Sequence, residues 1–219
     1  MADDIVTLFH SPQSRSGAAL VLLEELGAPY KLHVLNMKAG EQRRPEYLAV
    51  NPMGKVPAIR HRDALVTEQV AISIYLADAF PEVGLAPPIG DAERGTYLRW
   101  LVFYAACFEP AVSDRAMKRE AGSAQSSPYG DFDTMYETLV QHLSRQPFFT
   151  GERLSAADIL WGTALHWMTM FGLVPERPVI ADFIQKIVSR PSYKTMMDLD
   201  ATLAAEHQAA VDAAAQTGG

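Results

Sequence analysis

The sequence predicts a protein of two domains, an α/β domain in the first 80 residues and an all-α domain after it. Short apolar strands and helical patterns alternate as far as Phe80. Residues 81–88 contain three prolines and one glycine, and we expect no helix or strand at that density. Beyond them, apolar residues recur only at helical spacing. We therefore place the first domain at residues 1–80, a linker at 81–90 and the helical domain at 91–219.

The first domain has the expected order β-α-β-α-β-β-α. Its strands are predicted at 5–9, 29–35, 58–60 and 64–66, and its helices after the polar loop 10–14, at 45–48 and from 68 to about 80. Gly27 is expected to close the first helix, because glycine readily adopts the left-handed backbone conformation that ends a helix.

The second domain is predicted to contain only helices, at 92–108, 131–144, 155–171, 179–189 and 192 to about 214. Leu154-Ser-Ala-Ala-Asp-Ile159 is a local helix-start signal. Ser155 suits the N-cap, and Asp158 can reach back to the Ser155 N–H. Leu154 can pack on Ile159. We assign this segment a role in folding, not in chemistry.

Composition narrows the possible partners. The 219 residues carry a formal charge of −7 and 48% hydrophobic residues, which argues for folded cores and against nucleic acid or an anionic membrane as the main partner. No apolar run approaches the ~20 residues of a membrane span, and the first four residues do not resemble a signal peptide. One cysteine excludes an internal disulfide and a cysteine-rich metal site. We expect a cytoplasmic protein without a metal.

Two segments suggest a peptide-like ligand. In Asn51-Pro-Met-Gly-Lys-Val-Pro-Ala-Ile59, a cis Val56-Pro57 bond would turn the Val56 backbone outward and expose an edge with which a peptide can pair. In the second segment, 66–72, Glu68 and Gln69 stand where a strand ends and a helix begins, and helix N-termini favour carboxylates. A ligand with an amine, a carboxylate and a peptide backbone would fit both segments.

The order and spacing of these segments resemble the cytosolic glutathione transferases over nearly the whole chain. That resemblance implies a thioredoxin-like first domain, a cis-proline after a valine, and an acid-plus-hydroxyl pair at the third helix. The chain departs from the family at Gln69, where the usual residue is Ser. An amide can still donate to the γ-glutamyl carboxylate of glutathione, but its longer arm would shift the peptide. Segment 154–159 resembles the capping box in the helical domain of these enzymes.

The loop after the first strand is the candidate catalytic segment. Glutathione must react as a thiolate, whereas a free thiol titrates near ~8.5, so the protein must supply a donor to the sulfur and a positive field. Ser11, Ser14 and Ser16 offer hydroxyls, and Arg15 offers a cation beside a helix N-terminus. A serine before a helix is also an ordinary cap.

The resemblance favours Ser11 as the thiol donor, because it stands four residues before Arg15, as the hydroxyl does in the theta-like serine transferases. Ser14, one residue before Arg15, is the alternative. A tyrosine class is disfavoured because the first strand and loop contain no Tyr. The bacterial beta class carries a cysteine in this loop, and alignment on Ser11-Pro12 places Arg15 at that position, which disfavours a cysteine mechanism.

Several further residues are candidates for ligand binding. Lys55 matches the lysine that reaches the glycine carboxylate of glutathione in serine-type enzymes, and Gln42 occupies a comparable position in the polar loop. Aromatic stripes at helical spacing are usually core, but the helix after the linker must supply an apolar pocket between the domains. Phe103, Tyr104 and Cys107 are the candidates, although Cys107 in an apolar helix also fits a small core residue. The six histidines lack metal-ligand spacing.

These observations predict a glutathione transferase that conjugates the glutathione thiolate to an apolar electrophile, in a detoxification role and as a homodimer. Glutathione is the expected co-substrate. A glutathione-dependent isomerase or lyase of the same fold stays open, as does a non-catalytic binding or regulatory protein.

Overall fold

The computed structural model describes residues 4–120 and 122–217, so the first three residues of the N-terminal stretch assessed for a signal peptide lie outside it. The chain forms two compact units. One unit joins the chain up to Leu76 with the segment from Pro191 onward, and the other is Ala77–Arg190.

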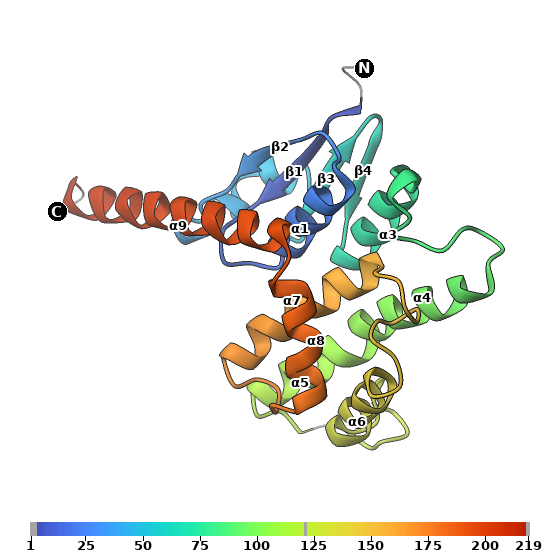
Figure 1. The fold of residues 1–219 in the computed structure, drawn as a ribbon. Helices are drawn as coiled ribbons and strands as arrows, with labels where there is room; N and C mark the ends of the chain where they lie inside the picture. The colour runs from blue at the N-terminus through green and yellow to red at the C-terminus, as the bar shows by residue number, and fades with distance from the viewer. Residues whose placement is uncertain (1–3, 121, 218–219) are drawn as a thin grey trace. The chain divides into compact units, whose positions relative to one another are not determined.

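A four-stranded mixed sheet organises the first unit (Figure 1). Its strands are β1 (Val6–His10), β2 (Tyr30–Val34), β3 (Ala58–His61) and β4 (Ala64–Thr67). The strand order is β2-β1-β3-β4, with β1 parallel to β2 and antiparallel to β3, which is antiparallel to β4. β1 and β3 pair on both edges, and most of their residues are buried, whereas β2 and β4 lie at the edges of the sheet.

The helices around this sheet follow the predicted order. They are α1 (Ser16–Leu26), η2 (Met37–Ala39), η3 (Glu41–Arg43), α2 (Pro45–Leu48) and α3 (Gln69–Ala79). Gly27 ends α1 in the left-handed conformation at φ +58°, as predicted. The thioredoxin-like arrangement of the first domain is thereby confirmed.

The described part of the second unit contains only helical elements, as predicted. They are η4 (Pro81–Val83), α4 (Ala92–Phe103), η5 (Tyr104–Phe108), α5 (Glu109–Ala116), α6 (Phe132–Leu143), α7 (Ala156–Met170) and α8 (Pro178–Val188). The expectation that no helix forms in residues 81–88 is wrong at η4, a 3₁₀ turn that Pro81 opens and Gly84 closes. A proline is tolerated at the first helical position because its missing N–H would have no partner there.

The helix predicted over 92–108 is not one continuous α-helix. It changes at Tyr104 into the π-helix η5, in which the Glu109 N–H donates to the Tyr104 carbonyl, and it continues as α5. Pro110 at the start of α5 has no N–H to offer to the preceding turn, and the wider π turn accommodates that loss.

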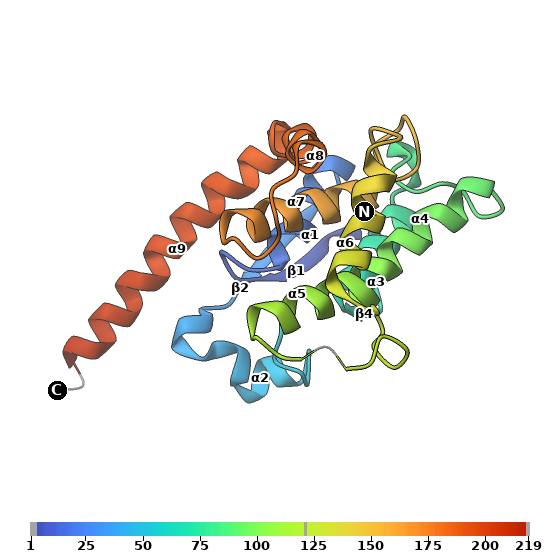
Figure 2. The ribbon, with the colours of Figure 1, turned by 90° about the horizontal axis from the view of Figure 1, so that it is seen from below.

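The C-terminal helix α9 (Pro191–Thr217) packs beside α1 in the first unit (Figures 1 and 2). The sequence prediction counted this segment as part of the helical domain at 91–219. In the structure, α9 belongs to the same compact unit as the sheet. The proposed boundaries between independently folding domains stay a prediction.

Three features stabilise the second unit. The buried Trp161 donates its ring N–H to the Trp100 carbonyl at 3.0 Å, which ties α7 to α4. The predicted capping box at Ser155 and Asp158 is present at the start of α7. Gly162 lets α8 approach, since a Cβ there would lie 2.3 Å from Ile187 Cγ1.

Candidate active site

The strand register brings three predicted site segments to one end of the sheet. Phe9 near the end of β1 pairs with Ala58 at the start of β3, and Ala58 pairs with Thr67 at the end of β4. The loop after β1, the segment before β3 and the turn after β4 are therefore neighbours. The predicted site residues on these segments are Ser11, Ser14, Arg15, Lys55, Val56, Pro57, Glu68 and Gln69.

Hydrogen bonds fix the loop between β1 and α1. The half-buried Ser14 hydroxyl donates to the Ser11 carbonyl at 2.7 Å, and its oxygen lies 2.7 Å from Ser16 Oγ. The Ser11 N–H donates to Ser16 Oγ at 3.1 Å. Within residues 4–120 and 122–217, no hydrogen bond occupies the Ser11 hydroxyl. The Ser14 proton is thus engaged in the loop, whereas the Ser11 proton is available for a ligand.

The α3 N-terminus lies against the same loop. Gln69, which is predicted to donate to a ligand carboxylate, donates from Nε2 to the Arg15 carbonyl at 3.2 Å, so one of its two amide protons is already used. Gln69 Oε1 is buried and has no donor among the described residues. Glu68 is exposed and has φ +68°, a left-handed conformation that is unusual for a glutamate. Backbone strain of this kind concentrates at functional sites.

The segment before β3 is held by side chains around its backbone. The Val56-Pro57 bond is cis, as predicted. The carbonyl of the exposed Lys55 accepts from the Tyr47 hydroxyl at 2.6 Å and from Asn51 Nδ2 at 2.8 Å. These two bonds orient the backbone that leads into Val56.

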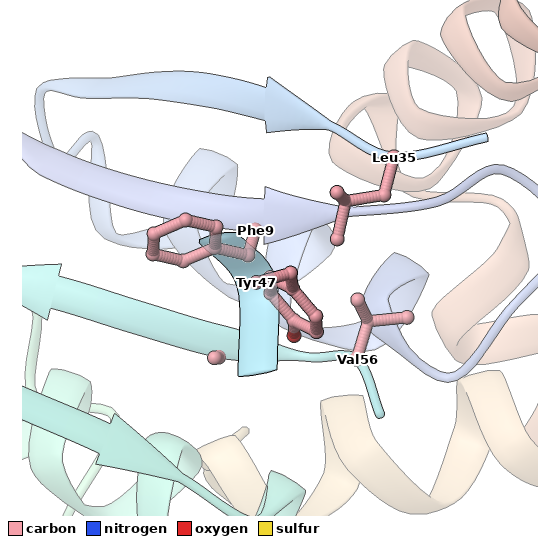
Figure 3. Close-up of a cluster of buried hydrophobic side chains, with 5 residues drawn as sticks. Phe9, Leu35, Tyr47 and Val56 are labelled. Carbon is pink, nitrogen blue, oxygen red and sulfur yellow. The ribbon is translucent and has the colours of Figure 1, made fainter. Parts of the chain in front are cut away.

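An apolar cluster anchors this segment to the sheet. Figure 3 shows Phe9 of β1, Leu35, Tyr47 of α2 and Val56, which belong to one buried cluster. Gln42 comes close through its backbone, because a Cβ at Gly54 would lie 2.8 Å from the Gln42 carbonyl oxygen. The structure therefore brings Gln42 to the turn that precedes Lys55.

The candidate pocket residues of the second unit differ in exposure. Tyr104 is buried, and its hydroxyl donates to Glu109 Oε1 at 2.6 Å. Phe103 is half-buried. Burial raises the pKa of the half-buried Cys107 thiol, whose Sγ lies 3.5 Å from the Pro128 carbonyl oxygen. A raised pKa favours the neutral thiol, so Cys107 suits an apolar contact better than nucleophilic chemistry.

Sequence reasoning missed a buried pair behind the catalytic loop. His10 is fully buried, with Nδ1 at 2.9 Å from Ser16 Oγ and Nε2 at 3.0 Å from Asp200 Oδ1 of α9. The other Asp200 oxygen accepts the Gln13 N–H at 2.7 Å. No local pattern could have identified Asp200, because 187 positions separate it from Gln13.

The described ranges of the chain offer no group of three or more His, Cys, Asp or Glu side chains placed to hold a metal ion. Within the same ranges, no helix is both long and apolar enough to cross a membrane.

Comparison with known protein families finds matches to two domains of one family. Residues 5–78 match the glutathione S-transferase N-terminal domain, and residues 129–185 match the C-terminal domain of that family. The chain belongs to the glutathione S-transferase family. In this chain, loop 11–16, the cis Val56-Pro57 bond and Glu68 all lie within residues 5–78, which match the N-terminal domain.

Relatives in the glutathione S-transferase family have more than one activity in their names. Glutathione S-transferase GstA of Escherichia coli O157:H7 is 28% identical over 88% of this chain and 98% of its own. Disulfide-bond oxidoreductase YfcG of Escherichia coli K12 is 27% identical over 86% of this chain and 92% of its own. A Sulfitobacter glutathione transferase homologue, solved with bound glutathione, has a TM-score of 0.72 at 27% identity and covers 89% of this chain and 98% of its own.

Proposed function

We propose that this protein is a glutathione transferase that conjugates the glutathione thiolate to an electrophilic, largely apolar co-substrate. The observation that supports it best is the meeting of Ser11, the Val56 backbone and Glu68 at one end of the sheet. These three groups match a thiol, a peptide backbone and an amine, all of which glutathione presents. The Sulfitobacter homologue with bound glutathione supports the same ligand.

The proposed chemistry needs a stabilised thiolate. The Ser11 hydroxyl donates to the glutathione sulfur, while Arg15 and the N-terminus of α1 add positive potential. Ser14 is the alternative donor, although its proton is engaged by the Ser11 carbonyl. The sulfur then forms a bond to the electrophilic carbon, the bond from that carbon to its leaving group breaks, and the leaving group departs with the bonding electron pair. The thiol proton passes to solvent.

The rest of glutathione is assigned to the neighbouring segments. The Val56 backbone, presented by the cis bond to Pro57, pairs with the cysteinyl part. Glu68 accepts from the γ-glutamyl amine, and Gln69 donates its remaining amide proton to the γ-glutamyl carboxylate. Lys55 reaches the glycine carboxylate, with Gln42 beside it.

The second unit supplies the apolar walls for the co-substrate in this proposal, through Phe103, Tyr104 and Cys107. Burial of the Tyr104 ring limits its part to the floor of such a pocket. Two copies of the chain are proposed to pair as a homodimer.

Glutathione binding is tested directly with Glu68→Ala. A charge-assisted hydrogen bond is worth ~1.5–3 kcal/mol, so we expect the calorimetric Kd for glutathione to rise at least tenfold. Asp63→Ala is the matched control, because Asp63 is an exposed acid on the β3–β4 hairpin at the opposite end of the sheet. An unchanged Kd in Glu68→Ala would refute the assignment of this residue.

Turnover separates the alternatives. A transferase should be retained on immobilised glutathione, be eluted by free glutathione and conjugate 1-chloro-2,4-dinitrobenzene. Retention with no conjugation of any electrophile, but with glutathione-dependent isomerisation, would favour the isomerase or lyase alternative. Retention without turnover would favour a binding or regulatory protein.

A further inference from the structure

One face of α9 contacts α1 and the loop before it, within the first unit, at successive turns. Its members are Ser192, Met196 and Asp200, spaced four residues apart, so they lie on one side of the helix. The Ser192 hydroxyl donates to Glu25 Oε1 of α1. Met196 packs against Gly17, where a Cβ would lie 3.2 Å from its Sδ. This face anchors α9 beside α1.

Asp200 is the member of this face that reaches the catalytic loop. Its side chain is 9% exposed, and its two oxygens face different partners. Oδ2 accepts the Gln13 N–H at 2.7 Å, and Oδ1 lies 3.0 Å from His10 Nε2. A carboxylate this buried is costly unless it is paired. These two contacts therefore replace water that would otherwise hydrate the Asp200 carboxylate.

Gln13 needs the support that Asp200 gives. Its φ of +56° is left-handed, which residues other than glycine adopt only at a cost. Such conformations persist where surrounding contacts determine them. The Asp200 carboxylate holds the N–H of Gln13, and Gln13 lies between Ser11 and Ser14, the two candidate thiol donors. The loop conformation that places these hydroxyls thus depends on a contact from the C-terminal helix.

The second contact of Asp200 is with His10. Among the described residues neither His10 Nε2 nor Asp200 Oδ1 has a hydrogen bond, so their 3.0 Å approach is a close contact only, and His10 Nδ1 lies 2.9 Å from Ser16 Oγ. Ser16 Oγ accepts the Ser11 N–H at 3.1 Å and can donate to the Ser11 carbonyl at 3.1 Å. Asp200 thus holds the loop by one hydrogen bond, to the Gln13 backbone, and packs against His10, which lies beside Ser16.

We propose that Asp200 is a positioning residue that holds the loop 11–16, and with it the thiol-activating hydroxyl, from the C-terminal helix. The proposal rests on the function proposed above, because it assigns the loop the role of thiolate donor. In this proposal Asp200 does not contact the ligand, so its removal should affect the thiolate and not the sites of the γ-glutamyl and glycine groups.

The test compares three variants of the full chain. Asp200→Ala removes the acceptor of the Gln13 N–H and the carboxylate that lies 3.0 Å from His10 Nε2. Asp200→Asn is the conservative variant for the Gln13 contact, because its carbonyl oxygen can still accept from the Gln13 N–H. Ser192→Ala removes an anchor of the same helix face that does not contact the loop. Amide hydrogen exchange of residues 11–16 is measured together with kcat/KM for conjugation and the Kd for glutathione.

We expect Asp200→Ala to speed amide exchange in residues 11–16 at least tenfold and to lower kcat/KM about tenfold, with the glutathione Kd within about twofold of the wild type. Asp200→Asn should recover most of both losses, and Ser192→Ala should change neither. Equal effects of Asp200→Ala and Ser192→Ala would show only a loss of helix docking and would overturn the proposal. So would unchanged exchange in Asp200→Ala.

The outcomes also separate this proposal from the function on which it rests. A wild type that neither binds glutathione nor conjugates refutes the proposed function. The exchange comparison still decides whether Asp200 holds the loop in that case. If Asp200→Ala does not fold, Asp200→Asn is compared with a folded Asp200→Ser. Slower amide exchange of residues 11–16 in Asp200→Asn than in Asp200→Ser, with the wild-type Kd for glutathione, supports the proposal. Equal exchange in the two variants overturns it.

Discussion

Replacement of Asp158 by alanine should remove a large part of the stability of this protein. Asp158 is fully buried, and its carboxylate accepts the Phe149 N–H at 2.7 Å, the Ser155 N–H at 2.8 Å and the Ser155 hydroxyl at 2.6 Å. Burial raises its pKa to about 6, although the hydrogen bonds from Ser155 and Phe149 act in the opposite direction. At neutral pH the group is therefore still mainly ionised.

The loss in Asp158→Ala follows from the donors left behind. Two backbone N–H groups would be buried without an acceptor, at ~1–3 kcal/mol each, whereas the Ser155 hydroxyl can rotate to another partner. We expect the free energy of unfolding to fall by ~3–5 kcal/mol, a large share of the ~5–15 kcal/mol typical of a folded domain. Urea denaturation followed by tryptophan fluorescence measures this loss from the shift in midpoint.

Two further variants test the reasoning behind that magnitude. Asp158→Asn keeps one oxygen for the two Ser155 donors and should lose less stability than Asp158→Ala. Asp131→Ala is the matched control, because Asp131 caps α6 through the Thr134 N–H at 2.8 Å but is exposed to water. Water can replace that exposed acceptor. If Asp158→Ala lowers the free energy of unfolding by no more than Asp131→Ala does, the buried N–H donors do not account for the predicted loss.

Two other predictions concern the thiol and the assembly. Ser11→Ala should raise the pKa of the bound glutathione thiol by about one unit and cut kcat/KM about tenfold, because a neutral hydroxyl is worth ~1.4 kcal/mol to the thiolate, with affinity nearly unchanged. Thiolate absorbance titration checks this; a shift in Ser14→Ala but not in Ser11→Ala would make Ser14 the donor. For the assembly, light scattering at micromolar concentration should report about twice the 24.1 kDa of one chain. A result at the monomer mass would contradict the homodimer.

Local sequence signals predicted much of the fold because the groups that satisfy them are close in the chain. Gly27 ends α1 through its own left-handed backbone. Ser155 and Asp158 meet within one helical turn, and the cis bond at Val56-Pro57 needs a proline at that position. Each of these features was predictable without knowledge of the rest of the structure.

Boundaries shaped by neighbouring elements were harder to predict. The helical pattern from Ala92 to Phe108 does not reveal the π-helix at Tyr104, because a π turn inserts a single residue and the segment stays helical on both sides. The sequence places the Gln69 amide at the start of the third helix, where it can donate to a ligand. Only the folded loop shows that this amide already donates one hydrogen bond to the Arg15 carbonyl.

By itself, the sequence determined the two-part organisation, the order of strands and helices, the cis-proline segment and the segment that carries the candidate thiol donor. Only the tertiary structure decided which hydroxyl of that segment has an unoccupied proton, and that α9 packs with the sheet. It also brought Asp200 to His10 and Gln13. The physical reason is that helix caps and turns depend on residues a few positions apart, whereas the partners of a buried carboxylate are chosen by packing across the whole chain.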